Sequence, residues 1–247
     1  MISKNQIKYI HQLEQKKYRQ REGVFVAEGP KVVGDLLSCG YEPRLLFATE
    51  RWQPTSGTFN LERVSEEELR KASFLQHPQQ VLAVFPLPDT PVEQPAGLSL
   101  ALDGVQDPGN LGTIIRIADW FGISTIYCSP DTADAWNPKV VQATMGSIAR
   151  VRIFYLDLES LLRSTPLPVY GTLLDGENIY EKNLSAEGII VMGNEGNGIS
   201  EPIRQLVGHR LLIPAFRKGA ESLNVAIATA ITCSEFRRSR STSEHIL

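Results

Sequence analysis

The chain has 247 residues and a mass of 27.4 kDa, enough for one large domain or two ordinary ones. Its composition, 42% hydrophobic and 21% charged, is typical of a globular protein, and no apolar run reaches the roughly 20 residues that cross a bilayer. The first ten residues lack the apolar core of a secretory signal. The three cysteines are far apart and form no CxxC pair, so we expect no disulfide framework, no metal site and a reducing, cytoplasmic location.

Basic side chains gather at the two ends of the chain, although the net charge is -3. Residues 1–22 hold six Lys or Arg against two Glu, and a second cluster follows at Arg237, Arg238 and Arg240. Such patches can hold a polyanion even on an acidic protein. On charge alone, solvated helix faces explain them equally well.

Four prolines between residues 86 and 97 mark the clearest boundary in the sequence. This density of proline forbids a helix and a central strand, and it is typical of a stiff extended linker. We therefore predict a first domain over 1–90, a linker over 91–97 and a second domain over 98–247.

The first domain reads as helices alternating with short apolar strands. Ser3 and Gln6 form a potential capping box, and Ser65 with Glu68 forms another. Pro30 fits the first turn of a helix that Gly40 ends. Strands are predicted over 24–29, 45–48 and 81–85. The order indicates a small three-layer α/β domain.

The second domain alternates more strictly between apolar strands and helices. Strands are predicted over 98–102, 124–128, 151–154, 168–174, 188–193 and 210–214. Helices are predicted over about 110–121, 138–146, 157–163, 200–207 and 221–238. This alternation is typical of a mostly parallel sheet with helices on both faces. Ligands bind such sheets at the carboxyl ends of the strands, so the loops there are the candidate site.

The first such loop, within residues 102–116, turns through a DPG sequence and enters a helix with Asn110 near its N-cap. Arg116 then lies in the middle of the helix among apolar neighbours. On these residues alone, the simpler interpretation of Arg116 is an exposed side chain that pairs with Asp119 or lies on Trp120.

The second loop, residues 191–200, carries three glycines after a buried strand, a composition that suits backbone amides around a nucleotide-like ligand. The glycine order is GxxGxG, which differs from the dinucleotide fingerprint GxGxxG, and the chain has no P-loop sequence. A simpler interpretation of Glu195 is a loop carboxylate near the start of a helix, where the helix dipole favours a negative charge.

The third loop follows the strand that ends at Ile213 and Pro214, and Ser222 and Asn224 open the last helix. Either residue could simply cap that helix. Three polar loops with glycine, all at strand ends and all leading into helices, favour one shared ligand.

Together the three loops resemble the SpoU/TrmH family of RNA ribose 2'-O-methyltransferases, in the SPOUT superfamily. The family's motifs are N-x-G-x-x-x-R, G-x-E-G-x-G, and I-P followed by S-L-N-V. They stand here as Asn110 to Arg116, Gly193 to Gly198, and Ile213-Pro214 with Ser222 to Val225. Residues 137–150 resemble the family segment between the first two motifs. Ala215, where many members carry Met, departs from the pattern.

This resemblance implies a second domain of SPOUT type, with a mostly parallel sheet and a deep C-terminal trefoil knot. It implies a first domain that binds the substrate, with the family's EG signature at Glu28-Gly29. S-adenosylmethionine is the implied cofactor, and a homodimer is the implied assembly. The implied cofactor-binding residues are Gly193, Asn194, Gly196, Ile213, Pro214, Leu223 and Asn224.

By the same resemblance, Arg116 is the implied catalytic residue. A guanidinium titrates too high to act as a simple base, so we expect it to grip an RNA phosphate or to stabilise the developing alkoxide. Asn110, Glu195, Ser222 and Asn224 would orient Arg116 and the ribose. Because the ribose 2'-hydroxyl distinguishes RNA from DNA, the implied substrate is RNA. The presence of the first domain favours rRNA over tRNA.

Three alternatives stay open on sequence. A Rossmann-type methyltransferase needs a DxGxGxG-like loop that the first strand does not supply. A nicotinamide dehydrogenase could use the loop at 193–198, despite its glycine order. A non-catalytic RNA-binding relative would keep the fold and would not bind the methyl donor.

Overall fold

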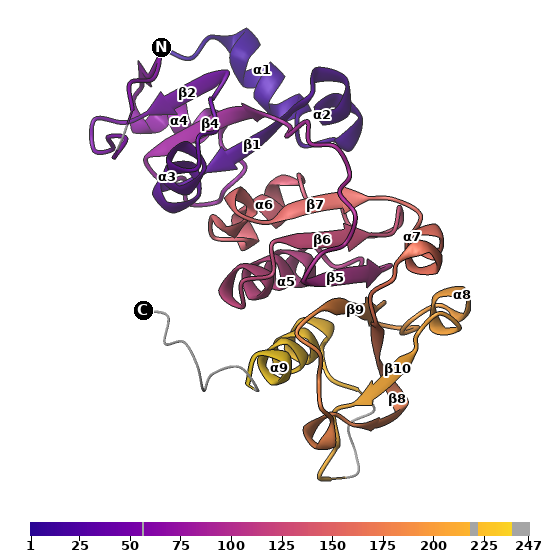
Figure 1. Ribbon diagram of the computed structural model, residues 1–247. Helices are drawn as coiled ribbons and strands as arrows, with labels where there is room; N and C mark the ends of the chain where they lie inside the picture. The colour runs from indigo at the N-terminus through magenta and orange to yellow at the C-terminus, as the bar shows by residue number, and fades with distance from the viewer. Residues whose placement is uncertain (56, 218–221, 239–247) are drawn as a thin grey trace. The chain divides into compact units, whose positions relative to one another are not determined.

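The computed structural model describes residues 1–55, 57–217 and 222–238 (Figure 1). The chain packs as two compact units. The first combines residues 1–91 with residues 134–150, and the second combines 92–133 with the described residues from 151 onward. Residues 134–150 therefore pack with the first unit, although the sequence boundaries assign them to the second domain.

The first unit is built around a four-stranded sheet of order β1-β4-β2-β3, in which β4 is antiparallel to both β1 and β2. β3 pairs parallel with β2. The elements from residues 1–91 are α1 (Lys4–Gln12), α2 (Lys16–Glu22), β1 (Val24–Glu28), α3 (Pro30–Ser38), β2 (Leu45–Ala48), β3 (Glu62–Arg63), α4 (Glu66–Ala72) and β4 (Val81–Pro86). Residues 134–150 add α6 (Pro138–Ala143) and the 3-10 turn η1 (Ser147–Ala149).

Both predicted capping boxes are confirmed. The Ser3 hydroxyl accepts from the Gln6 N–H at 3.2 Å, and the Gln6 side chain accepts from the Ser3 N–H at 2.8 Å. Ser65 and Glu68 make the same reciprocal pair at the start of α4. These bonds satisfy amide donors that a helix start otherwise leaves without partners. The N-terminal basic segment forms two helices, and Gly23, with φ of 63°, ends the second.

Alternate residues of β1 supply the two cores of the first unit. Val24 and Val26 belong to one apolar cluster with residues of α1 and α4, such as Ile10. Phe25 points the other way and packs on Trp136 with ring centroids 4.7 Å apart. Residues of α1 and α4 cover the face of Val24 and Val26, and α3 and the segment that contains α6 cover the face of Phe25, so the sheet has helices on both faces, as the three-layer prediction requires.

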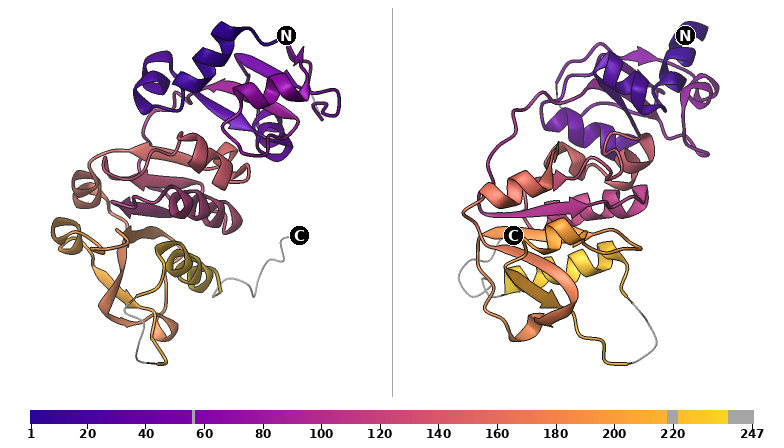
Figure 2. Two further views of the ribbon diagram at one scale, coloured as in Figure 1. Left: turned by 180° about the vertical axis from the view of Figure 1, so that it is seen from behind. Right: turned by 90° about the vertical axis from the view of Figure 1, so that its right-hand side faces the viewer.

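The second unit contains a six-stranded sheet of order β10-β8-β9-β5-β6-β7, and all its strand pairings are parallel. The predicted fold class is confirmed by this sheet. Its elements are β5 (Leu98–Asp103), α5 (Pro108–Trp120), β6 (Thr125–Cys128), β7 (Arg152–Tyr155), α7 (Leu158–Ser164), β8 (Val169–Asn178), η2 (Ile179–Glu181), β9 (Gly188–Gly193), α8 (Glu201–Arg204), β10 (His209–Leu212) and α9 (Val225–Arg238). Figure 2 shows this unit from two further sides, with α5 and α9 packed together.

Several helix ends differ from the sequence prediction. The helix expected over 138–146 ends at Ala143, because Met145 and Gly146 adopt φ values of 52° and 95° that reverse the chain. The helix expected over 200–207 is limited to Glu201–Arg204. The last helix begins at Val225, so the predicted start at 221 is too early: residues 222–224 precede the helix, and Asn224 accepts from the N–H groups of its first turn. Residue 221 itself lies outside the described residues.

The register of the central strands brings two of the predicted loops together. Asp103, the last residue of β5, lies directly opposite Gly193, the last residue of β9. The loop at 104–107 and the loop at 194–200 therefore start side by side at the carboxyl edge of the sheet. Among the described helices, none is both long enough and apolar enough to span a membrane.

Candidate active site

Asn110 connects the three predicted loops through its side-chain amide. Its Nδ2 donates to Glu195 Oε1 at 3.0 Å, and its Oδ1 accepts from Asn224 Nδ2 at 2.9 Å. Each residue comes from a different loop, and the two bonds span 85 and 114 residues of sequence. The predicted convergence of these loops is therefore a geometric fact of the second unit.

The Glu195 carboxylate also accepts backbone hydrogen bonds from the first loop. The N–H groups of Gln106 and Asp107 donate to its two oxygens at 3.2 Å each. Partial burial alone would raise its pKa, but the bonds from Asn110 and from these backbone amides hold the pKa of Glu195 below its ordinary value. The carboxylate is thus ionised at neutral pH, and it ties the second loop to the first.

The start of α5 explains how Asn110 is aimed at the other loops. The Asp107 side chain accepts from the Asn110 N–H at 2.8 Å and is the N-cap of the helix. Asn110 is therefore near the N-cap, as predicted, but it is the third helical residue, and the predicted helix start at about residue 110 is two residues too late. Pro108 has a backbone angle preset for the first helical position and lacks the N–H that would be unsatisfied there, so the helix begins earlier.

The glycine-bearing loop is shaped by close backbone packing. A Cβ on Gly193 would lie 2.2 Å from the Gly198 carbonyl carbon and 2.2 Å from the Ile199 nitrogen, so only glycine fits. Asn194 closes the turn, because its N–H and C=O both pair with Gly198 at 2.9 Å. Its side chain accepts from the Gly196 N–H at 2.9 Å. The loop is preformed, and Asn194 holds its shape.

The third loop contributes one bridging residue and an apolar edge. Asn224 Oδ1 accepts from the N–H groups of Ala226 and Ile227, so the expected capping role and the bridge to Asn110 occur in the same side chain. Ser222 and Leu223 are exposed. Ser222 makes no hydrogen bond within the described part of the chain, so the structure does not join it to Asn110 and Glu195.

Ile213 and Pro214 follow β10 and are half-buried. They lie beyond the edge strand of the sheet, and no described hydrogen bond joins their side of the loop to Asn110 or Glu195. The structure therefore links Asn110, Glu195 and Asn224 directly, with Gly193, Asn194 and Gly196 in the adjoining turn.

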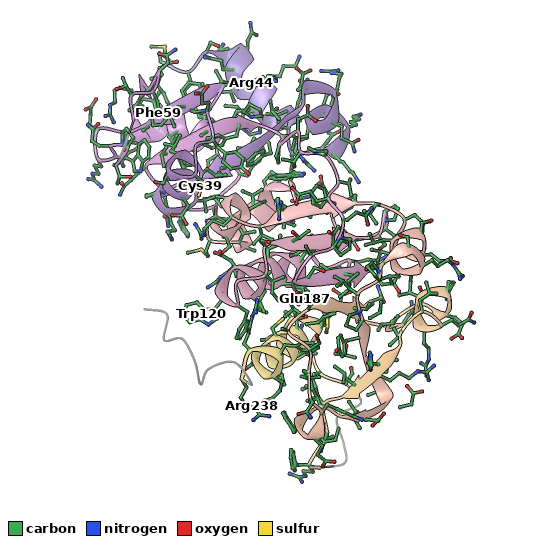
Figure 3. All side chains as sticks on the ribbon, viewed as in Figure 1. Cys39, Arg44, Phe59, Trp120, Glu187 and Arg238 are labelled. Atoms are coloured by element: carbon green, nitrogen blue, oxygen red, sulfur yellow. The ribbon has the colours of Figure 1, made fainter. Side chains whose placement is uncertain are left out.

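Arg116 is exposed on α5, six residues after Asn110 and about 9 Å further along the helix axis. Within residues 1–55, 57–217 and 222–238 it makes no hydrogen bond or ion pair, so the alternative in which it pairs with Asp119 is not observed. Trp120 lies one helical turn later and is 84% exposed (Figure 3). Arg116 is thus available to an external partner and is not bonded to the three bridged residues.

Sequence reasoning missed two residues that hold the loops in place. Asp103 Oδ2 accepts from the Ser200 N–H at 2.7 Å, and the Gly104 carbonyl accepts from Asn194 Nδ2 at 2.7 Å. An acidic residue at the end of a buried apolar strand was the available signal for Asp103. Among the described residues, no group of three or more His, Cys, Asp or Glu side chains could hold a metal ion.

A parallel α/β sheet with preformed glycine loops at neighbouring strand ends defines a domain that binds a nucleotide-like cofactor. Residues 97–234 match the model of the SpoU rRNA Methylase family, and residues 4–83 match that of the MRM3-like substrate binding domain. The chain therefore belongs to the SpoU rRNA methylase family, which confirms the resemblance carried by the three motifs.

Individual relatives cover nearly the whole chain. The 23S rRNA (guanosine(2553)-2'-O)-methyltransferase RlmP of Bacillus subtilis is 33% identical over 93% of this chain and 95% of its own length. A TrmH-family structure from Porphyromonas gingivalis superposes with a TM-score of 0.89 at 46% identity, covering 97% and 99% of the two chains. An AdoMet-bound rRNA methyltransferase from Sinorhizobium meliloti gives a TM-score of 0.85 at 31% identity, covering 97% of each chain.

Proposed function

We propose that this protein transfers the methyl group of S-adenosylmethionine to a ribose 2'-hydroxyl of ribosomal RNA. The observation that carries the proposal is the Asn110 bridge, because it unites the three family motifs within one subunit. The RlmP relative is named for this reaction on 23S rRNA, and residues 4–83 match a substrate-binding domain. Ribosomal RNA as substrate favours a cytoplasmic location.

The residues present fit a nucleoside cofactor. Gly193 and Gly196 offer backbone without side-chain obstruction, and Asn194 holds their turn in shape. Leu223, Ile213 and Pro214 supply apolar contact surface in the third motif. S-adenosylmethionine, when bound, supplies an electrophilic methyl group on a positively charged sulfur, and the ionised Glu195 is electrostatically compatible with that charge.

Arg116 is the proposed catalytic residue. A guanidinium is a planar cation with five N–H donors, and it can hold an RNA phosphate with two parallel hydrogen bonds. The ribose 2'-oxygen would accept the methyl group that S-adenosylmethionine supplies, and the phosphate oxygen that Arg116 holds would accept the hydroxyl proton. Asn110, Glu195, Ser222 and Asn224 are the proposed orienting residues. Tight alignment is the main contribution of such groups.

We further propose that the active form is a homodimer. Trp120 on α5 is 84% exposed, and Ile227 on the neighbouring α9 is 52% exposed. Large apolar side chains exposed on two adjacent helices are typical of an interaction surface. Arg116 shares the exposed face of α5 with Trp120, so a second copy docked there would receive Arg116 into its own cofactor loops.

The chain path supports the trefoil knot that the resemblance implies, and we include the knot in the proposal. β10 forms one edge of the sheet, but α9, which follows it, packs on α5 and β9 nearer the centre. The chain must therefore return past β8 after leaving the edge strand.

Arg116→Ala tests the catalytic assignment. We expect methyl transfer from labelled S-adenosylmethionine to an in vitro 23S rRNA transcript to be abolished, because the phosphate grip is lost. Calorimetry should show cofactor affinity within a few-fold of wild type, since Arg116 lies outside the glycine loop. Arg163→Ala is the matched control, an exposed helical arginine of the same unit paired with Glu159.

Full activity of Arg116→Ala would overturn the role of Arg116. A wild-type protein that binds the transcript but gives no calorimetric signal with S-adenosylmethionine would instead identify a non-catalytic RNA-binding relative. Mapping the 2'-O-methylated nucleotide on the transcript identifies the target position.

A further inference from the structure

The exposed charge of the first unit is unevenly distributed. Lys16, Lys17 and Arg21 are exposed on α2, and Arg44 is exposed where its guanidinium donates to the Glu22 carbonyl at the end of that helix, at 2.9 Å (Figure 3). We name Lys16, Lys17, Tyr18, Arg21 and Arg44 the α2 surface. Glu22 is the acid that contacts it, through its ion pair with Arg21 at 2.8 Å.

An aromatic ring holds two of these cations in place. Lys17 Nζ lies 4.9 Å from the centre of the Tyr18 ring, and Arg21 Cζ lies 5.0 Å from it. Tyr18 itself packs against the apolar cluster of the first unit, so the ring is anchored from beneath. Cations held in this way lose less side-chain entropy when they bind a ligand.

Helix α4 of the same unit has the opposite character. Its first turn consists of Glu66, Glu67 and Glu68, and the cations in its last turn, Arg70 and Lys71, lie beside these acids. Lys71 forms an ion pair with Glu67 at 2.8 Å. A polyanion is repelled by the start of α4 and attracted by the α2 surface.

We propose that the α2 surface binds the phosphate backbone of the RNA substrate, with Lys17 and Arg21 as phosphate contacts positioned by Tyr18. Phosphates recur at short intervals along RNA, so cations one helical turn apart can contact successive groups. The contacts are independent of base identity, and they position the RNA on the first unit. The inference rests on the proposed function only for the identity of the RNA.

The test compares two double variants of the full-length protein that remove the same charge from the same unit. K17Q/R21Q changes the α2 surface, and R70Q/K71Q changes α4. Binding of an in vitro 23S rRNA transcript is followed by filter retention between about 50 and 300 mM KCl. Thermal melting verifies that both variants fold like wild type.

We expect K17Q/R21Q to weaken binding roughly tenfold near 0.15 M salt and to make the slope of log K against log salt shallower by about 1.5. R70Q/K71Q should leave both quantities unchanged. Tyr18→Leu should weaken binding a few-fold with an unchanged slope, because the ring positions the cations without contacting phosphate.

Equal effects of the two double variants would overturn the inference, since only net charge would then matter. Unchanged binding by K17Q/R21Q would also overturn it, and the α2 surface would be free for an acidic protein partner. Methylation of the transcript by wild type is scored separately. Failure of the proposed function and failure of this surface therefore give different results.

Discussion

Replacing Asn110 by Ala removes the two side-chain hydrogen bonds by which Asn110 joins Glu195 of the second loop and Asn224 of the third loop. A bond to a charged acceptor such as Glu195 is worth about 1.5–3 kcal/mol, and a neutral amide bond such as that with Asn224 is worth about 1 kcal/mol. Water replaces part of each bond because the site is exposed, so we take the total as about 2 kcal/mol. If cofactor binding requires all three loops in place, affinity falls roughly thirtyfold.

Asn110→Asp makes the test more specific. It keeps the oxygen that accepts from Asn224 but replaces the donor 3.0 Å from Glu195 with a second carboxylate oxygen. Two adjacent carboxylates repel each other and raise a pKa, so the Asp variant should bind S-adenosylmethionine more weakly than the Ala variant.

Calorimetric titration with S-adenosylmethionine measures this order of affinities. The matched control is Gln205→Ala, which removes an exposed amide-to-carboxylate bond to Glu201 of 3.3 Å and leaves the three loops joined. Wild-type affinity in both Asn110 variants would refute the reasoning that the bridge organises the site.

Three further predictions concern packing, pH and a buried charge. Gly193→Ala should destabilise the protein by about 2 kcal/mol or more in urea unfolding, because its Cβ meets backbone, whereas Gly196→Ala should have little effect. Cofactor affinity should be constant above the ordinary carboxyl pKa of 4.5 and should fall as the pH drops through the lowered pKa of Glu195, because the carboxylate then loses its charge. In a pH titration of cofactor affinity, Glu195→Gln should not show this fall. Arg19→Ala should cost about 3–5 kcal/mol in the same urea assay, because Asp134 loses its buried partner; a loss below 1 kcal/mol would contradict this.

Local patterns were sufficient to predict most elements of both units. The strands at 98–102 and 188–193 are short, mostly apolar runs bounded by polar turns, and such runs fit a sheet buried on both faces. That these two strands are neighbours, with Asp103 opposite Gly193, depends on pairing across 90 residues. Periodicity carries no information about that pairing. The position of the loops at strand ends and the motif resemblance were the indications that the loops meet.

The buried Arg19 shows why charge counts mislead. It belongs to the basic N-terminal segment, but only 2% of it is exposed, and it donates to the carbonyls of Leu13 and Glu14 and to the Asp134 carboxylate. Its acidic partner lies 115 residues away, so no local pattern distinguishes it from Lys17. Sequence placed the positive charges in this segment correctly but could not sort the solvated side chains from the buried one.

The packing of residues 134–150 with the first unit affects the order in which the protein folds during synthesis. Trp136 covers Phe25, and Asp134 neutralises Arg19, but both are made about 110 residues later than their partners. Domains generally fold as they leave the ribosome, N-terminal first. Here the first 91 residues emerge with one sheet face covered by α3 but not yet by residues 134–150, and this unit completes its core only after the ribosome has released residue 150.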